Sequence, residues 1–199
     1  MLDEQTRIIL PPERFPMSDA LLLIDIQNDY FPGGRMELVG AEQAGQAASR
    51  VLARFRSAGL PVAHIRHESV RHGSTFFLPG TKGAAIHACV APLPGETVIL
   101  KHYPNSFRET ALLETLRGLA ATRLTICGMM THMCVDTTVR AAFDLGFECR
   151  LVADACATRD LTFGGRAAAA VEVQVAFMAA LGSVFAQVVN VADVKVPQA

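Results

Sequence analysis

The sequence predicts one α/β domain over residues 1–199, a Rossmann-like three-layer sandwich in which helices cover both faces of a six-stranded, mostly parallel sheet. Two observations lead to this prediction. Short, continuous apolar runs alternate with longer segments of helical periodicity, and no change of composition divides the 199 residues. Such runs are typical of strands buried on both faces, and their alternation with helices implies a parallel sheet with right-handed crossovers. With 51% hydrophobic and 19% charged residues, the chain can bury a full core.

The individual elements follow from the same patterns. The first strand is the apolar run ALLLIDI at 20–26, and the first helix spans 41–59, where Gly59 ends it. Five further runs rich in Val, Ile and Leu predict strands at 61–68, 97–103, 123–129, 147–155 and 186–194. Three more helices fit between them, at 107–120, 131–146 and 164–182.

One stretch, 69–96, carries Gly, Pro and aromatic residues where a crossover helix is expected. Long structured loops in compact domains tend to be functional. We therefore expect this loop to shape a binding site.

Composition and charge exclude several classes of partner. A net charge of −1 and a pI near 6.6 provide no electrostatic attraction for nucleic acid or an anionic membrane. The N-terminal MLDEQTRIILPPERF is too polar for a signal peptide, and no apolar run reaches the roughly 20 residues of a membrane span. Five cysteines without a CxxC pattern indicate reduced thiols. We expect a cytoplasmic protein whose partner is a small molecule or another copy of the chain.

Three titratable residues fall at the carboxyl ends of predicted strands, where ligands bind in such sheets. Asp25 lies late in the first strand, Lys101 late in the third, and Cys134 just after the fourth, where a helix begins. A helix N-terminus favours the nucleophilic thiolate. Each residue also has a structural interpretation. Cysteines are mostly inert packing, Asp25 could cap a turn or pair with an arginine, and Lys101 could extend to the surface. Their joint position at three ends of one sheet favours function.

Three motifs also resemble a known family. ALLLIDIQNDYF, KHYPNSF and GMMTHMCVDTTVRAAFDLGF are similar, in order and spacing, to the signatures of the isochorismatase-like cysteine hydrolases, which include nicotinamidases and N-carbamoylsarcosine amidases. The resemblance covers residues 19 to 190 and implies a catalytic triad of Asp25, Lys101 and Cys134. It also implies a cis peptide bond between Met129 and Met130, and an oxyanion hole formed by the backbone N–H groups of Met130 and Cys134.

The chemistry that these residues imply is acyl transfer. Cys134 attacks a carbonyl after Asp25 takes its proton, and Lys101 stabilises the charges. Because a thiol nucleophile suits amide, carbamoyl or lactam C–N bonds rather than a vinyl ether, we expect a cysteine amidohydrolase that forms a thioester. Two alternatives stay open: a true isochorismatase-type ether hydrolase, and a redox-sensing or binding protein that uses a reactive Cys134.

Neither a cofactor nor a metal is expected. The nicotinamidases have an Asp-x-His stretch after the second strand, whereas this chain has HIRHES at 64–69. A zinc site formed by His64, His67, Glu68 and His72 is the alternative.

The pocket is expected to be lined by residues adjacent to the three strand ends, namely Tyr30, Phe31, Tyr103, Phe107, Thr131 and His132. Phe76 and Phe77 could line it or pack in the core. The last helix is apolar around its circumference, which favours a homodimer or a higher homo-oligomer.

Overall fold

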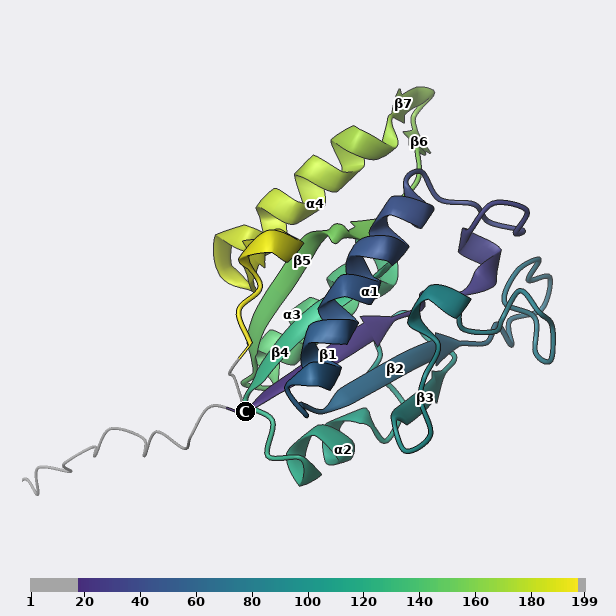
Figure 1. Ribbon diagram of the computed structural model, residues 1–199. Coiled ribbons are helices and arrows are strands. Elements are labelled where there is room, and N and C mark those ends of the chain that lie inside the picture. The colour runs from purple at the N-terminus through teal and green to yellow at the C-terminus, as the bar shows by residue number, and fades with distance from the viewer. Residues whose placement is uncertain (1–17, 197–199) are drawn as a thin grey trace, which may run out of the picture.

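A six-stranded sheet with the strand order β3-β2-β1-β4-β5-β8 forms the centre of the computed structural model (Figure 1). All five neighbouring pairs are parallel, which confirms the predicted fold class. The model describes residues 18–196, so the N-terminal stretch judged too polar for a signal peptide lies outside the described residues. The strands of the sheet are β1 (Asp19–Ile24), β2 (Val62–His67), β3 (Thr97–Lys101), β4 (Arg123–Met129), β5 (Glu148–Ala157) and β8 (Gln187–Val189).

Helices cover both faces of the sheet. In Figure 1, α1 (Ala41–Ser57) lies in front of the sheet and α3 (Asp136–Asp144) behind it. One buried apolar cluster lies between the sheet and α1. The second lies between the other face and α3 together with α2 (Leu112–Gly118) and α4 (Ala170–Val184). Because strand side chains alternate, Leu21 and Leu23 join the first cluster, and Leu22 and Ile24 join the second. Within residues 18–196, none of the helices combines the length and apolar character needed to cross a membrane.

The helix predicted at 164–182 begins too early. Residues 161–168 instead form an antiparallel hairpin of β6 (Leu161–Phe163) and β7 (Arg166–Ala168), which projects beyond α4 in Figure 1. Its turn is Gly164-Gly165, and both residues have positive φ, at 57° and 76°. Two-residue hairpin turns require this conformation, which glycine adopts at little cost.

Other predicted elements are shorter in the structure. The helix predicted at 107–120 starts at Leu112, since Ser106 bonds through its backbone N–H and its hydroxyl to Thr138 of α3 and holds the preceding residues in turns. The strand predicted at 186–194 pairs only over Gln187–Val189, after which a 3-10 turn (Val191–Asp193) bends the chain under α1. The helix predicted at 131–146 begins as a π-helical turn (Thr131–Val135) that leads into α3.

The loop at 69–96 is irregular, as predicted, apart from one 3-10 turn (Ala88–Val90). Side chains that follow β1 hold it in place. The Asp29 carboxylate accepts the Phe77 backbone N–H at 2.6 Å, and the Gln27 amide donates to Ala84 O at 2.7 Å. The loop is thus attached to the carboxyl end of β1, where the candidate site lies.

Candidate active site

The three strand-end residues meet at one point. Asp25 follows β1, Lys101 ends β3, and Cys134 lies in the π-helical turn between β4 and α3. Lys101 Nζ is 2.7 Å from Asp25 Oδ2 and 3.3 Å from Cys134 Sγ. Since β2 separates β3 from β1, only a long side chain on β3 can reach Asp25. The structure therefore places an acid, an ammonium and a thiol in mutual contact.

All three side chains are shielded from solvent. Asp25 is 0% exposed, Lys101 1% and Cys134 6%. Burial lowers the pKa of Lys101, but the charge of Asp25 and the proximity of Cys134 outweigh it and leave that pKa raised. Lys101 is accordingly an ammonium, and it compensates the buried Asp25 carboxylate.

The pKa of the Cys134 thiol is raised above its ordinary value. Burial raises its pKa, and the charge of Asp25 and a hydrogen bond to that carboxylate raise it further, while Lys101 opposes both. Desolvation therefore opposes the effect of the helix N-terminus, which favours the thiolate. A nucleophilic Cys134 needs a base, and the adjacent Asp25 is in a position to serve as one.

The backbone at Asp25 is left-handed, with φ of 52°. In a regular strand, position 25 would share the face of Leu21 and Leu23, which is covered by α1. The site lies on the opposite face, where Cys134 belongs to the cluster under α3. Non-glycine residues with such φ values store strain and occur preferentially at functional sites, and aspartate tolerates this conformation better than most residues.

Strands β1 and β4 approach each other closely just before the turn that follows β4. Gly128 is paired with Ile24, and a Cβ atom at position 128 would lie 2.5 Å from Ile24 O. The next peptide bond, Met129–Met130, is cis. Met130 O then accepts the N–H groups of Met133 and Val135, which begins the turn that carries Cys134.

Two further groups contact the Lys101 ammonium. His67 Nδ1 is 2.9 Å away and Tyr103 O is 3.1 Å away. Sequence reasoning considered His67 only as a metal ligand. Its pairing with Lys101 depends on the β2–β3 register, in which the two residues are direct partners.

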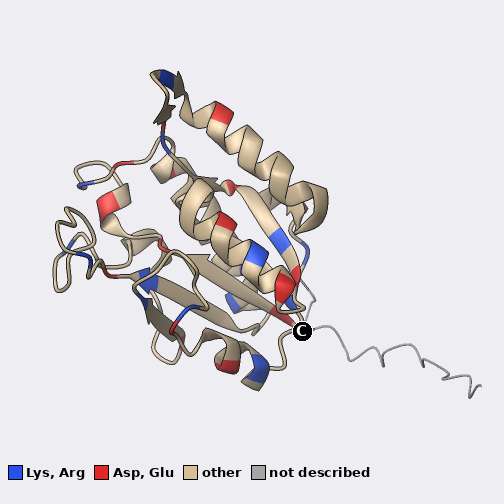
Figure 2. Ribbon diagram, turned by 180° about the vertical axis from the view of Figure 1, so that it is seen from behind, with Lys and Arg blue, Asp and Glu red and all other residues tan. Residues whose placement is uncertain are grey.

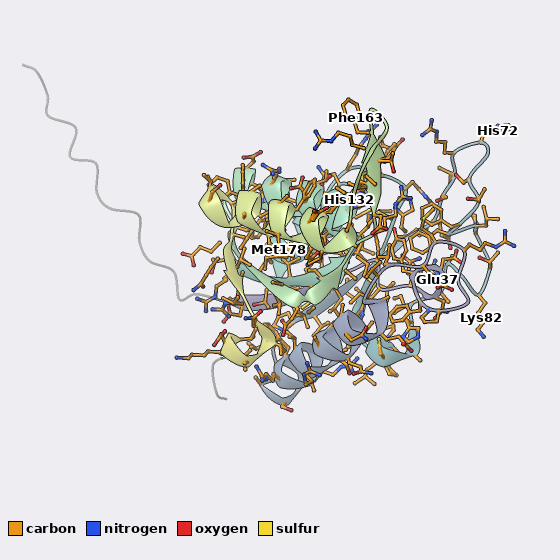
Figure 3. The ribbon with its side chains drawn as sticks, turned by 90° about the horizontal axis from the view of Figure 1, so that it is seen from above. Glu37, His72, Lys82, His132, Phe163 and Met178 are labelled. Carbon is orange, nitrogen blue, oxygen red and sulfur yellow. The ribbon has the colours of Figure 1, made fainter. Side chains whose placement is uncertain are left out.

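The four residues proposed for the alternative zinc site do not converge. His64 Nε2 bonds to Glu96 at 2.9 Å, and Glu68 pairs with Arg66. His72 lies at the outer end of the 69–76 loop (Figure 3). Among the described residues, the ligand atoms of Asp25, His67 and Cys134 lie within 4.8 Å of one another, but the Lys101 ammonium contacts each of these side chains. The lysine thus supplies the positive charge at that place.

The residues expected to line the pocket separate into two groups. Burial raises the pKa of Tyr30, and the charges of Cys134 and Asp25 raise it further. The phenol therefore lies close enough to these two residues to interact with their charges. Tyr103 contributes its carbonyl, and its ring lies under Arg108. His132, two residues before Cys134, bonds through Nδ1 to Thr158 at 2.6 Å.

The other expected pocket residues pack elsewhere. Phe31 stacks on His87 with ring centroids 3.6 Å apart and contacts α1, and Phe107 pairs with Phe147 at the start of β5. Thr131 is fully buried, and its hydroxyl lies within hydrogen-bond distance of Ala157 O and Gln174 Oε1. These three were chosen for sequence proximity, which does not determine the direction of a side chain.

The loop at 69–96 supplies two further features. Phe77, 1% exposed, packs its ring edge-on to Tyr30, with the ring centroids 4.6 Å apart. A cavity of about 510 Å³ lies between residues 69–76, His102 and Pro104, and His67 forms part of its lining. His67 therefore separates the buried triad from an open cavity.

Comparison with known proteins agrees with this architecture. The family model for the isochorismatase domain matches residues 19–193. The Bacillus subtilis protein YddQ, described as an uncharacterized isochorismatase family protein, is 49% identical over 86% of this chain and 96% of its own. The crystal structure of a putative isochorismatase hydrolase from Oleispira antarctica superposes with a TM-score of 0.86, at 50% identity, over 88% of this chain and 95% of its own. The chain belongs to the isochorismatase family of hydrolases, and the resemblance seen in the sequence is confirmed.

More distant relatives carry names that indicate amide hydrolysis. The ureidoacrylate amidohydrolase RutB of Methylobacterium radiotolerans is 27% identical over 74% of this chain and 72% of its own. Amidohydrolases are therefore among the relatives of this hydrolase.

Proposed function

We propose that the protein is a cysteine amidohydrolase that cleaves a C–N bond of a small carboxamide, carbamoyl compound or lactam. The observation that carries this proposal is the buried contact of Lys101 Nζ with both Asp25, at 2.7 Å, and Cys134, at 3.3 Å. A nucleophile, its base and a fixed cation are the parts that covalent acyl transfer needs.

The first step forms the thioester. Asp25 takes the Cys134 proton, and the thiolate attacks the carbonyl carbon. The resulting oxyanion is held by the backbone N–H groups of Met130 and Cys134, and each such donor contributes about 2.7–4 kcal/mol in comparable enzymes. The protonated Asp25 then gives its proton to the leaving nitrogen, and the C–N bond breaks.

The second step releases the product. Asp25 accepts a proton from water and the hydroxide attacks the thioester carbonyl. The C–S bond then breaks, the carboxylic acid leaves, and the Cys134 thiolate takes the proton back from Asp25. Lys101 remains an ammonium throughout and offsets whichever negative charge is present, on the carboxylate or on the sulfur. No step needs a metal or a cofactor, and we propose none.

The direct test is intact-mass spectrometry after incubation with a mixed panel of carboxamides, carbamoyl compounds and lactams. We expect an acyl adduct on the wild-type protein, or product release, that is lost in Cys134→Ala and falls steeply in Asp25→Asn and Lys101→Ala. Cys149→Ala is a matched control, because Cys149 is a buried thiol at the far end of β5, with a pKa raised by burial to about 12. Turnover of the panel that survives in Cys134→Ala would exclude the thioester route.

The raised pKa of Cys134 argues against the redox-sensing alternative, since sensor thiols are low in pKa and accessible. A sensor would also need a resolving thiol, and the candidates Cys127 and Cys156 are both buried, which raises the pKa of each. Rapid oxidation of Cys134 by dilute peroxide, with no turnover of any panel compound, would reverse this preference.

We also propose that the protein forms a homo-oligomer through the outer face of α4. Val173 and Met178 face the core, while Val171 and Val175 are 68% and 64% exposed. Figure 2 shows the helix almost free of charge, and its only charged residue is Glu172. Phe163, on the hairpin that precedes α4, is a further exposed apolar residue, at 92% exposure (Figure 3). Light scattering of the wild type and of Val171→Lys/Val175→Lys tests this, with a shift to monomer expected.

A further inference from the structure

His67 is the last residue of β2, and its side chain is directed by the sheet toward Lys101. The two residues are Cα partners in the parallel β2–β3 ladder, so their side chains lie side by side on one face. The buried Gln27 amide fixes the backbone of His67 from both directions. Gln27 Oε1 accepts the His67 N–H at 2.7 Å, and Gln27 Nε2 donates to His67 O at 2.8 Å.

The contact between His67 and Lys101 defines the tautomer of the imidazole. The Lys101 ammonium has only N–H donors, so the His67 Nδ1 that lies 2.9 Å away must be unprotonated and accept. The ring proton then resides on Nε2. Burial lowers the pKa of His67 to about 4, and Lys101 lowers it too, against the opposite effect of Asp25. Lys101, Asp25, Cys134 and His102 are the titratable groups that face the ring.

The ammonium has fewer protons than neighbours. Lys101 carries three N–H groups, but four acceptors lie within 3.3 Å of Nζ. They are Asp25 Oδ2, His67 Nδ1, Tyr103 O and Cys134 Sγ. The three hydrogen bonds go to His67 Nδ1, Tyr103 O and Cys134 Sγ, and Asp25 Oδ2, which accepts none, is held as an ion-pair partner.

We propose that His67 is a positioning residue, whose Nδ1 holds the Lys101 ammonium so that its third N–H is directed at Cys134 Sγ. This inference rests on the proposed hydrolase function. At rest Asp25 Oδ2 is the ion-pair partner of the ammonium at 2.7 Å, and the third N–H bonds to the thiol sulfur at 3.3 Å. When Asp25 has taken the thiol proton it is neutral, and the same N–H stabilises the Cys134 thiolate. Without His67, the ammonium is free to turn toward Asp25, which removes that N–H from the sulfur.

The test compares two substitutions of His67. His67→Asn places an amide oxygen near the position of Nδ1 and keeps an acceptor, whereas His67→Leu has similar reach and none. We expect His67→Leu to lower kcat about 10- to 100-fold, the usual effect of losing a hydrogen bond to a charged group, with KM changed less than about threefold. His67→Asn should recover most of the loss. Equal kcat in wild type and His67→Leu, or equal losses in both variants, would overturn the inference.

A second measurement does not depend on activity. In the ¹⁵N spectrum of the histidine-labelled wild type, the His67 signals, assigned by their absence in His67→Asn, should show an unprotonated Nδ1 and a protonated Nε2 that do not titrate between pH 8 and about 5. A protonated Nδ1, or titration near the ordinary value of about 6.5, would overturn the inference. If the wild type hydrolyses no panel compound while this spectrum is obtained, the proposed function fails and the His67–Lys101 contact stands.

Discussion

The ammonium of Lys101 lies 2.7 Å from the carboxylate of Asp25, and neither side chain reaches solvent. A buried pair of this kind contributes little net stability compared with an apolar pair of equal volume, because both charges lose their hydration. Removal of one partner, however, leaves an uncompensated charge. The pair is therefore best explained by the chemistry of the site, and its energetics can be measured.

Asp25→Asn removes the charge of the side chain and keeps its shape. Asparagine tolerates the left-handed backbone at this position, so the fold should be retained. Loss of the base should lower kcat/KM by about 10²- to 10⁴-fold. The unpaired Lys101 should also lower the free energy of unfolding by about 3–5 kcal/mol.

Urea denaturation of Asp25→Asn, Lys101→Met and the double variant measures the coupling between the two residues. We expect the double variant to be clearly more stable than the sum of the single losses predicts, yet inactive. Additive losses would contradict the pairing.

The reactivity of Cys134 toward iodoacetamide should move in opposite directions in the two single variants. Asp25 raises the pKa of the thiol and Lys101 lowers it, although burial is the largest contribution. At pH 7–8, alkylation should therefore be faster in Asp25→Asn than in the wild type and slower in Lys101→Met. Mass spectrometry of the peptide that carries Cys134 provides the rate. If Asp25→Asn slowed alkylation, the carboxylate would be stabilising the thiolate. That result would contradict the effect of the Asp25 charge, which raises the pKa of Cys134.

Gly128→Ala should separate β1 from β4 at the site. The new Cβ would lie 2.5 Å from Ile24 O and 2.7 Å from Ile24 Cβ, so the strands must move apart next to Asp25. We expect a loss of about 1–3 kcal/mol in the free energy of unfolding, together with a fall in kcat. Gly118→Ala is the matched control, because a Cβ there meets nothing within 4 Å and glycine weakens a helix. A thermal melt of the two variants should show opposite shifts.

Stability should fall in two stages as the pH is lowered. The pKa of His67 is lowered to about 4, and burial lowers that of His64, so below pH 6.5 the unfolded chain binds protons that the folded chain does not. The pKa of Glu96 is lowered to about 2, first by its hydrogen bond to Arg56, so its contribution is lost between about pH 4.5 and 2.

Urea midpoints measured from pH 8 to 3 test this dependence. Glu96→Gln should flatten the lower stage. It should leave much of the upper stage in place, because His67 does not contact Glu96. A stability that stayed constant between pH 7 and 4.5 would show that the buried histidines titrate normally.

Much of the fold was predictable because strand and helix periodicity are local properties of a segment. The continuous apolar runs identified every strand of the main sheet, and the ends of three of them identified Asp25, Lys101 and Cys134. The Gly164-Gly165 turn was missed, since Ala-rich neighbours favoured a helix and two adjacent glycines were not weighed as a hairpin signal.

The assignment of pocket residues was less accurate. Phe31 and Phe107 follow strand ends, as Tyr30 and Tyr103 do, yet their rings pack on His87 and Phe147. Nothing in the local sequence distinguishes the two pairs, because the side to which a loop residue points depends on the segments that cover it.

The sequence by itself determined the parallel sheet, the residues at the carboxyl ends of its strands, and the family. The tertiary structure decided which of these residues touch, and in what state of charge. His67 meets Lys101 only through the β2–β3 register, and the pKa of Cys134 is raised chiefly because the site excludes water. Both outcomes depend on segments far apart in the chain, since desolvation and hydrogen-bond partners are properties of the packed site and not of any one segment.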